Sequence, residues 1–384
     1  MPRAGQGKVA PVGRLSDRIA VGLLVRAFPP HLVDRVIADC GRTEQRSRVL
    51  PARLVVYFVL AMCLFSAESY CEVAQLLAHG MTWAGHAQGP LWVPTTAAIS
   101  RARAKLGAEP LAALFAAVAG SPSALVSVPQ QPRGRDDRAR WRALGLDSTV
   151  FSVPDSAENR ERFGAPVGNC PAQHAFPEVR VAALTDWASG TIARAVFGSR
   201  TLTDAALVDR LITDLTRGEL LLVDDCFTDR WPTTCAMGRN LLWRAHPRAQ
   251  LPVRRTLTDG SYLTEITVAD RDAGRAAGRF AARVITASAL GGAQSCRLLT
   301  TVLDHTTSPA RALAALYHER GMLGRCLQDM RAHLTSEPRI VLRSRWPEGV
   351  EQELWGHLLI HHAVRMSLHS AASDIPSLRA TGSP

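Results

Sequence analysis

Residues 219–225 have the sequence Glu-Leu-Leu-Leu-Val-Asp-Asp (ELLLVDD), an apolar run that ends in two carboxylates. A strand without alternating polar positions is buried on both faces, which is typical of the centre of a sheet with parallel neighbours. We therefore predict a central parallel strand here, preceded by an amphipathic helix over residues 201–217. The fold is best understood outward from this strand.

Three shorter strands are predicted upstream, over residues 144–153, 179–187 and 191–198, with turn-like residues between them. Three meandering strands, a helix and then a buried strand place the first strand beside the fourth in one sheet. Another strand is expected at residues 240–244. The sequence from about residue 141 therefore predicts an α/β domain with a mixed sheet and flanking helices.

Two aspartates occupy positions of chemical interest in this sheet. Asp147 lies in the first strand, and Asp224 lies at the carboxyl end of the fourth. Carboxylates on neighbouring strands, near the end where open sheets place ligands, could share Mg²⁺ or Mn²⁺ for phosphoryl transfer. The alternative is that each aspartate caps a turn or a helix.

Residues 14–120 show helical patterning throughout, and they follow a Gly/Pro-rich, basic segment over residues 1–13 that we expect to be disordered. Thr95 or Thr96 is the expected N-cap of a basic helix that stops at Gly107. Its side chains Arg101, Arg103 and Lys105 suit contact with DNA. The alternative is an ordinary solvated helix face.

The net charge of +11 comes almost entirely from arginine, because Lys8 and Lys105 are the only lysines. Guanidinium groups match phosphate geometry, so a polyanion is the expected partner, although arginine richness can also reflect genomic base composition. The sequence contains no P-loop, no Gly-x-Gly-x-x-Gly after a strand, no Gly-x-Ser-x-Gly and no His-Glu-x-x-His.

The compartment is indicated by the cysteines and the apolar runs. The eight cysteines form no Cys-x-x-Cys pair, and the longest apolar run, residues 54–65, is too short to span a membrane. The first residues contain no apolar core of a signal peptide. We expect a soluble, cytoplasmic protein without a membrane partner.

The last predicted helix, from Trp346 to Ala371, offers one more cluster. Glu353, His357 and His361 recur at a spacing of four residues, which could ligate a metal. A polar helix face is the favoured alternative. The apolar stripe on the same helix is interpreted as core packing, and it consists of Leu354, Leu358 and Val364 with Trp355.

Several stretches together resemble the DDE-type transposases of the insertion-element-four family. They are the helical residues 15–73, PTTAAISRARAKLGAEPL (94–111), LDSTVFSVPDSAENRERFG (146–164), LLLVDDCFTDRW (220–231) and LLWRAHPRAQLPVRRTLTDGSYL (241–263). The resemblance covers almost the whole chain, from about Leu15 to Ala371. It implies that Asp147 is the first catalytic aspartate and that Asp224, rather than Asp225, is the second.

This resemblance implies a ribonuclease-H-like core, interrupted by an all-β insertion and preceded by a helical, DNA-binding domain. It also implies that two Mg²⁺ or Mn²⁺ ions held by Asp, Asp and Glu support cleavage of double-stranded DNA at inverted-repeat ends and strand transfer into target DNA. A homodimer on nucleoid DNA is expected. The segments are a tail (1–13), a helical domain (14–120), a linker (121–140), the core (141–245 and 304–372), the β insertion (246–303) and a second tail (373–384).

The third acid departs from the family pattern Y-(2)-R-(3)-E-(6)-K. The segment YHERGMLGRCLQDMR supplies Tyr317 and Arg320, but the glutamate position is Gly324 and the lysine position is Arg331. Tyr317, Arg320 and Arg331 are expected near DNA phosphates, or, alternatively, in packing against the sheet. Because Gly324 is no metal ligand, two hypotheses follow: a transposase with impaired activity, or a DNA-binding remnant that does not cut.

Overall fold

The computed structural model describes residues 15–44, 50–83, 94–119, 141–164, 176–187, 189–216, 218–223, 238–270, 275–288, 295–319, 327 and 342–373. The chain divides into two compact units. The helical unit comprises Met1–Ser121, Val153–Arg162 and Val341–Leu368, and the sheet unit comprises Pro122–Ser152, Phe163–Ile340 and His369–Pro384. The expected tail 1–13, the linker, Asp224 and the expected tail 373–384 except Ser373, which ends the last helix, lie outside the described residues.

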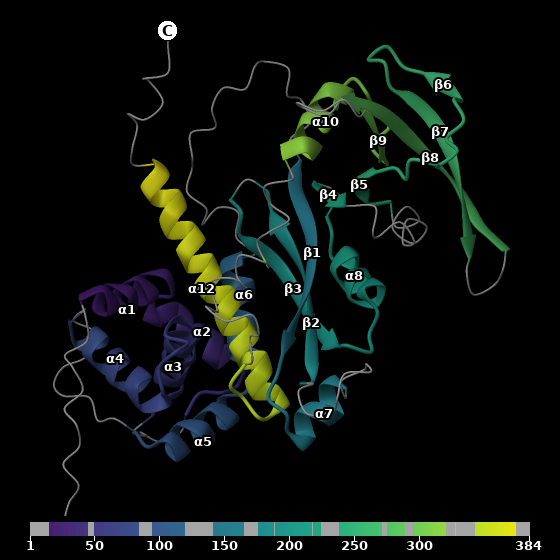
Figure 1. Ribbon diagram of the computed structural model, residues 1–384. Helices are drawn as coiled ribbons and strands as arrows, with labels where there is room; N and C mark the ends of the chain where they lie inside the picture. Colours follow the sequence, from purple (N-terminus) through teal and green to yellow (C-terminus); the bar gives the residue numbers. More distant parts are fainter. Residues whose placement is uncertain are drawn as a thin grey trace, which may run out of the picture. The chain divides into compact units, whose positions relative to one another are not determined.

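The strands of the described chain form one mixed sheet in the order β3-β2-β1-β4-β5-β9-β8-β7-β6 (Figure 1). Its strands are β1 (Arg142–Ser152), β2 (Glu178–Asp186), β3 (Ile192–Ser199), β4 (Glu219–Val223), β5 (Asn240–Arg244), β6 (Arg255–Thr256), β7 (Tyr262–Asp270), β8 (Arg275–Ser288) and β9 (Ser295–Thr300).

The predicted neighbours of the central strand are confirmed. β1 runs parallel to β4, with Arg142 opposite Glu219 and Gly145 opposite Leu222, while β4 also runs parallel to β5. β2 pairs antiparallel with β1 and with β3. The apolar sequence of β4 thus belongs to a strand with a parallel partner on each side.

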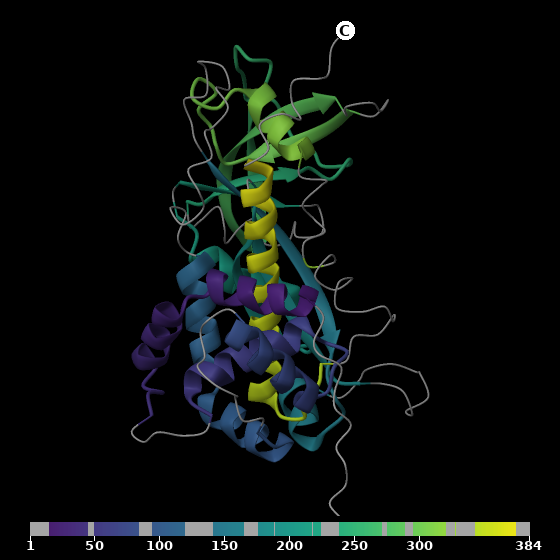
Figure 2. The same ribbon diagram turned by 90° about the vertical axis from the view of Figure 1, so that its left-hand side faces the viewer.

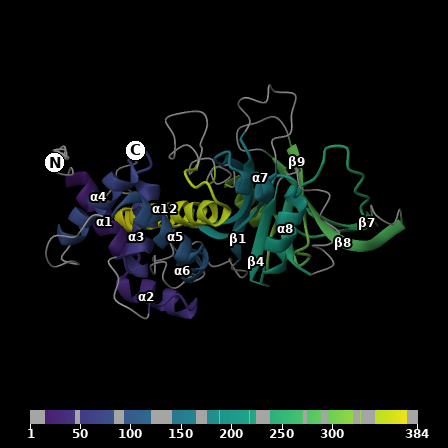
Figure 3. The same ribbon diagram turned by 90° about the horizontal axis from the view of Figure 1, so that it is seen from below.

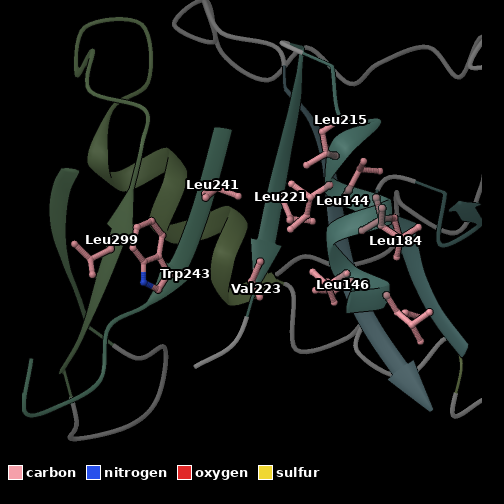
Figure 4. Packing of buried hydrophobic residues seen from close by; sticks show 14 of the residues in the cluster. Leu144, Leu146, Leu184, Leu215, Leu221, Val223, Leu241, Trp243 and Leu299 are labelled. Carbon is pink, nitrogen blue, oxygen red and sulfur yellow. The ribbon is translucent and has the colours of Figure 1, made fainter. Parts of the chain in front are cut away.

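Both faces of this sheet are covered, which explains why β4 is apolar throughout. One face packs on α8 (Asp204–Thr213), and Figure 3 shows this helix against the sheet. The other face packs on α10 (Ala310–Glu319). Alternate β4 residues divide between these two cores: Leu221 and Val223 lie on the α8 side, which Figure 4 shows, whereas Leu220 and Leu222 lie on the α10 side.

The β-rich stretch predicted over residues 246–303 contains β6, β7, β8 and β9. Its strands extend the same sheet, because β9 pairs antiparallel with β5. β8 lies between β9 and β7 and pairs antiparallel with both. The turn predicted at Asp259-Gly260 is present. Gly260 adopts a backbone φ of 80°, which residues other than glycine rarely adopt.

The helical unit contains six helices from the N-terminal part of the chain (Figures 1 and 2): α1 (Leu15–Ala27), α2 (Pro30–Asp39), α3 (Ala52–Leu64), α4 (Tyr70–Trp83), α5 (Thr96–Leu106) and α6 (Glu109–Ala119). The Thr95 hydroxyl accepts the Ala98 N–H at 3.3 Å, so Thr95 is the N-cap of α5. Gly107 ends this helix with a φ of 74°. No helix among the described residues is long and apolar enough to cross a membrane.

The last helix, α12 (Pro347–Ser373), differs from its expected placement. We expected residues 304–372 to complete the α/β core, but Val341–Leu368 groups with the N-terminal helices, as does Val153–Arg162, which contains most of α7 (Ala157–Phe163). The physical reason is that α12 buries Leu354 and Leu358 within this unit and bonds α5 through Gln352. Val364, predicted to pack in the core, is 47% exposed.

Candidate active site

Asp147 lies in β1, two residues beyond Gly145, the last β1 residue with an assigned partner in β4. Strand alternation places it on the same face as Ala143, which packs in the core under α10. Its carboxylate is half-buried, and Oδ2 accepts the backbone N–H of Leu327 at 3.3 Å. Asp147 therefore lies at the carboxyl end of the parallel β1–β4 pair, facing the chain that follows α10.

The end of β4 is held by a hydrogen bond from α10. The hydroxyl of Tyr317 donates to the carbonyl oxygen of Val223 at 3.2 Å, and the Tyr317 side chain is buried. Asp224, which follows Val223 in the sequence, lies outside the described residues. The packing alternative for Tyr317 is thus observed, together with a polar bond next to the second aspartate.

The remaining positions of the resembled helix motif, Arg320, Gly324 and Arg331, lie outside the described residues. Leu327, three residues after Gly324, is described and is the donor to Asp147. Of this segment, the described contact to Asp147 is therefore the one made by Leu327. Within the described ranges, no group of three His, Cys, Asp or Glu side chains forms a metal site.

Carboxylates at the opposite end of the sheet have a different role. Asp186 and Glu219 are buried, and each accepts hydrogen bonds or ion pairs from arginine. Arg142 Nε lies 2.7 Å from Asp186 Oδ2, and Arg194 Nη2 contacts both Glu219 oxygens at 2.8 and 2.9 Å. These ion pairs join the starts of β1, β3 and β4 to the end of β2, and the two carboxylates are compensated by arginine.

The basic helix α5 separates into exposed and buried cations. Arg101 and Lys105 are exposed, as a DNA-contacting face requires. Arg103 is fully buried, and its guanidinium donates to Gln352 at 3.1 Å and to Ser344 at 2.9 Å. The prediction that Arg103 contacts DNA is therefore corrected, because its donors are used inside the helical unit.

The acid–histidine series on α12 forms part of the interior. Glu353 accepts the Arg343 N–H at 2.7 Å and also bonds the Ser344 hydroxyl, and it is 2% exposed. Burial, with a smaller effect of Arg343, lowers the pKa of His357 to about 3, so this imidazole is neutral. The side chains at positions 353 and 357 do not form the polar outer face that we favoured.

Sequence comparisons relate this chain to known transposases. Residues 18–116 match the profile "Insertion element 4 transposase N-terminal". The chain is 26% identical over 361 residues to the Escherichia coli "Transposase InsG for insertion sequence element IS4", with 90% of this chain and 76% of that protein covered. The profile match and this relative support the resemblance to the insertion-element-four transposases. A second Escherichia coli family relative, InsZ, is 23% identical over 209 residues, which cover 52% of this chain and 63% of InsZ.

A solved structure of a transposase with bound DNA also shows a weak similarity to this chain. The piggyBac transposase synaptic complex with hairpin DNA aligns with a TM-score of 0.40 and 11% identity, covering 93% of this chain and 76% of the piggyBac chain. A likeness of this size does not define a shared fold, so the site rests on the contacts described above.

Proposed function

We propose that this chain is a DNA transposase of the DDE type that cuts DNA at the ends of its element and joins those ends to target DNA. The observation that carries the proposal is the position of Asp147. It lies at the carboxyl end of the β1–β4 pair, with Leu327 bonded to its carboxylate and Tyr317 bonded to the end of β4. Asp147 and Leu327 thereby lie together, and Tyr317 contacts the last described residue of β4.

We also propose a ribonuclease-H-like core. Supporting it are the strand order β3-β2-β1-β4-β5 and the directions within it, antiparallel for β1–β2 and β2–β3 and parallel for β1–β4 and β4–β5. Strands β6 to β9 then constitute the β insertion, placed in the chain between β5 and α10.

Asp147 and Asp224 are the residues that would hold Mg²⁺ or Mn²⁺. Hard, anionic oxygens suit these ions, and the Asp147 carboxylate is half-buried, with Oδ2 3.3 Å from the Leu327 N–H that it accepts. Asp224 is the next alternate residue after Leu220 and Leu222, which face α10, and this favours Asp224 over Asp225. When bound, the ions supply Lewis-acid stabilisation of phosphoryl transfer.

The DNA partner is proposed from charge and position. Arg101 and Lys105 present exposed cations on α5, and Arg320 and Arg331 follow Tyr317 in the sequence at positions of the resembled motif. These groups would bind phosphates of the inverted-repeat ends and of target DNA. We propose that two copies of the chain act together on a pair of element ends.

A second candidate function is a DNA-binding remnant that occupies the element ends without cutting them. Gly324 favours it, because glycine supplies no carboxylate at the third acid position. The loss of one ligand from a two-metal site would weaken metal binding and misplace the reacting groups. Both candidates bind DNA, and only the first cleaves it.

The experiment incubates the purified full chain with Mn²⁺ and a duplex that carries the flanking inverted repeats. An active transposase cleaves the strand ends, Asp147→Ala abolishes the cleavage, and the neighbouring control Ser148→Ala retains it. Binding without cleavage in all three proteins would establish the remnant instead. Restored cleavage in Gly324→Glu would then assign the defect to the missing carboxylate.

A further inference from the structure

The β insertion contains a fully buried arginine that no part of the proposed mechanism uses. Arg283 lies on β8, and its guanidinium donates from Nε to the Ser261 hydroxyl and from Nη1 to the Ser308 carbonyl, both at 2.7 Å. Its Nη2 group donates to Asp259. A buried guanidinium is costly unless it is paired, so this set of partners is required for Arg283 to remain in the interior.

Asp259 connects this arginine to the start of α10. One carboxylate oxygen accepts the N–H of Ala310, the first residue of the helix, at 2.8 Å, and the other accepts the Ser261 N–H at 3.2 Å. Burial opposes ionisation, but the bonds from Ser261 and Ala310 and the charge of Arg283 outweigh it and lower the pKa of Asp259. The anion satisfies a helix-start donor and complements the helix dipole.

The opposite end of α10 is bonded to β4. Tyr317 lies seven residues after Ala310, or about 10 Å along the helix axis, and its hydroxyl donates to the Val223 carbonyl. Leu313, between these points, packs on the sheet in the same core as Tyr317. The direction of α10 is therefore fixed at its start by the β insertion and near its end by the strand that leads to Asp224.

We propose that Asp259 and Arg283 are positioning residues for the active site. By fixing the start of α10, they hold Tyr317 against the carboxyl end of β4, next to the site of Asp147. This inference rests on the proposed function, since it concerns the same metal site. It makes the insertion a structural part of that site, because an error of about 1 Å in such a constellation can cost a factor of about one hundred in rate.

The test compares Asp259→Asn and Arg283→Lys with the control Glu265→Gln. Glu265 lies on β7 of the same insertion, in a surface ion pair with Arg254. Hydrogen exchange of residues 310–319 reports the anchoring of α10, and Mn²⁺ affinity, measured by electron paramagnetic resonance without DNA, reports the site. Both variants are expected to speed exchange in α10 and to weaken Mn²⁺ binding about tenfold, while the control changes neither.

A structural role alone would lower the melting temperature and leave the Mn²⁺ affinity of the folded fraction unchanged, and that result overturns the inference. Unchanged exchange in α10 also overturns it. If both variants fail to fold, Ser261→Ala, which removes one hydrogen bond to Arg283, takes their place. The same two measurements, hydrogen exchange in α10 and Mn²⁺ affinity, then test the inference. If the wild-type chain binds Mn²⁺ no better than Asp147→Ala, the proposed function is wrong. If the wild type binds Mn²⁺ better than Asp147→Ala but Asp259→Asn and Arg283→Lys bind it as well as the wild type, only this inference is wrong.

Discussion

Arg103 introduces a full positive charge into the interior of the helical unit. The charge is balanced by Glu353, whose Oε1 lies 3.6 Å from Nη2, and the guanidinium lies 5.0 Å from the Trp346 ring centroid. Removing one member of a buried pair leaves the other without compensation. Arg103→Met should therefore destabilise the protein by about 3–5 kcal/mol.

Chemical denaturation measures this loss, with Lys105→Ala as the matched control on the same helix. The exposed lysine should change the free energy of unfolding by about 0.5 kcal/mol or less. Equal effects of the two substitutions would contradict the description of Arg103 as an internal cation.

Two buried histidines on α12 make stability depend on pH. Burial lowers the pKa of His357 to about 3 and that of His362 to about 4, with Arg343 adding to the effect at His357. The unfolded chain protonates near pH 6.5, so it binds more protons than the folded chain below that pH, and stability falls as the pH drops from 6.5 toward these values. Each histidine contributes a slope of about 1 kcal/mol per pH unit.

Urea denaturation between pH 7 and pH 5 tests this effect, since most carboxylates titrate at lower pH. His357→Leu should show a shallower decline in the free energy of unfolding over this interval, and the exposed control His246→Gln should follow the wild type. A wild-type free energy that stays constant over this interval would be inconsistent with neutral buried histidines.

At the scale of single residues, the sequence could indicate chemistry but not burial. Spacing placed Arg101, Arg103 and Lys105 on one basic helix, yet the partners of Arg103 include Tyr70 from another helix and Gln352 and Ser344 from more than 240 positions away along the chain. Asp259 and Arg283 were missed as a pair for the same reason. The Asp-Gly turn was visible in the sequence, but its bond to α10 depends on tertiary contact.

At the scale of elements, α3 and α12 meet where Gly356 faces Cys63. A Cβ at position 356 would lie 2.6 Å from the Cys63 Sγ atom, so Gly356→Ala must push the helices apart or displace the thiol. We expect a loss of about 1–3 kcal/mol in thermal or chemical unfolding. Adding Cys63→Ala should recover most of it, and a double-mutant cycle without coupling would contradict this contact.

The elements themselves were largely predictable. The uninterrupted apolar run of β4 and the meander before it determined the order of the first four strands, because strand burial and short connections leave few alternatives. The partner of α12 was not predictable. An amphipathic pattern states that one face is buried, but not which surface covers it, and the cover here is the helical unit.

At the scale of the whole molecule, the net charge of +11 predicts salt-dependent DNA binding. Affinity for duplex DNA, measured by fluorescence anisotropy over a salt series, should fall steeply with salt in the wild type. The slope should decrease by about one for Arg101→Ala and again for Lys105→Ala. Arg53→Ala, whose charge is paired with Asp34, is the control, and slopes identical in all variants would exclude α5 from the interface.

The helical unit is assembled from three separate stretches of chain, and Glu353 and Gln352 reach Arg103 only from the last of them. On the ribosome, the N-terminal stretch up to Ser121 must therefore wait for the synthesis of residues 341–368 before its interior is complete. A premature stop codon ahead of position 347 would leave the Arg103 guanidinium without Glu353 and Gln352. Quality-control proteases should then clear such fragments before they can occupy the element ends in competition with the full-length protein.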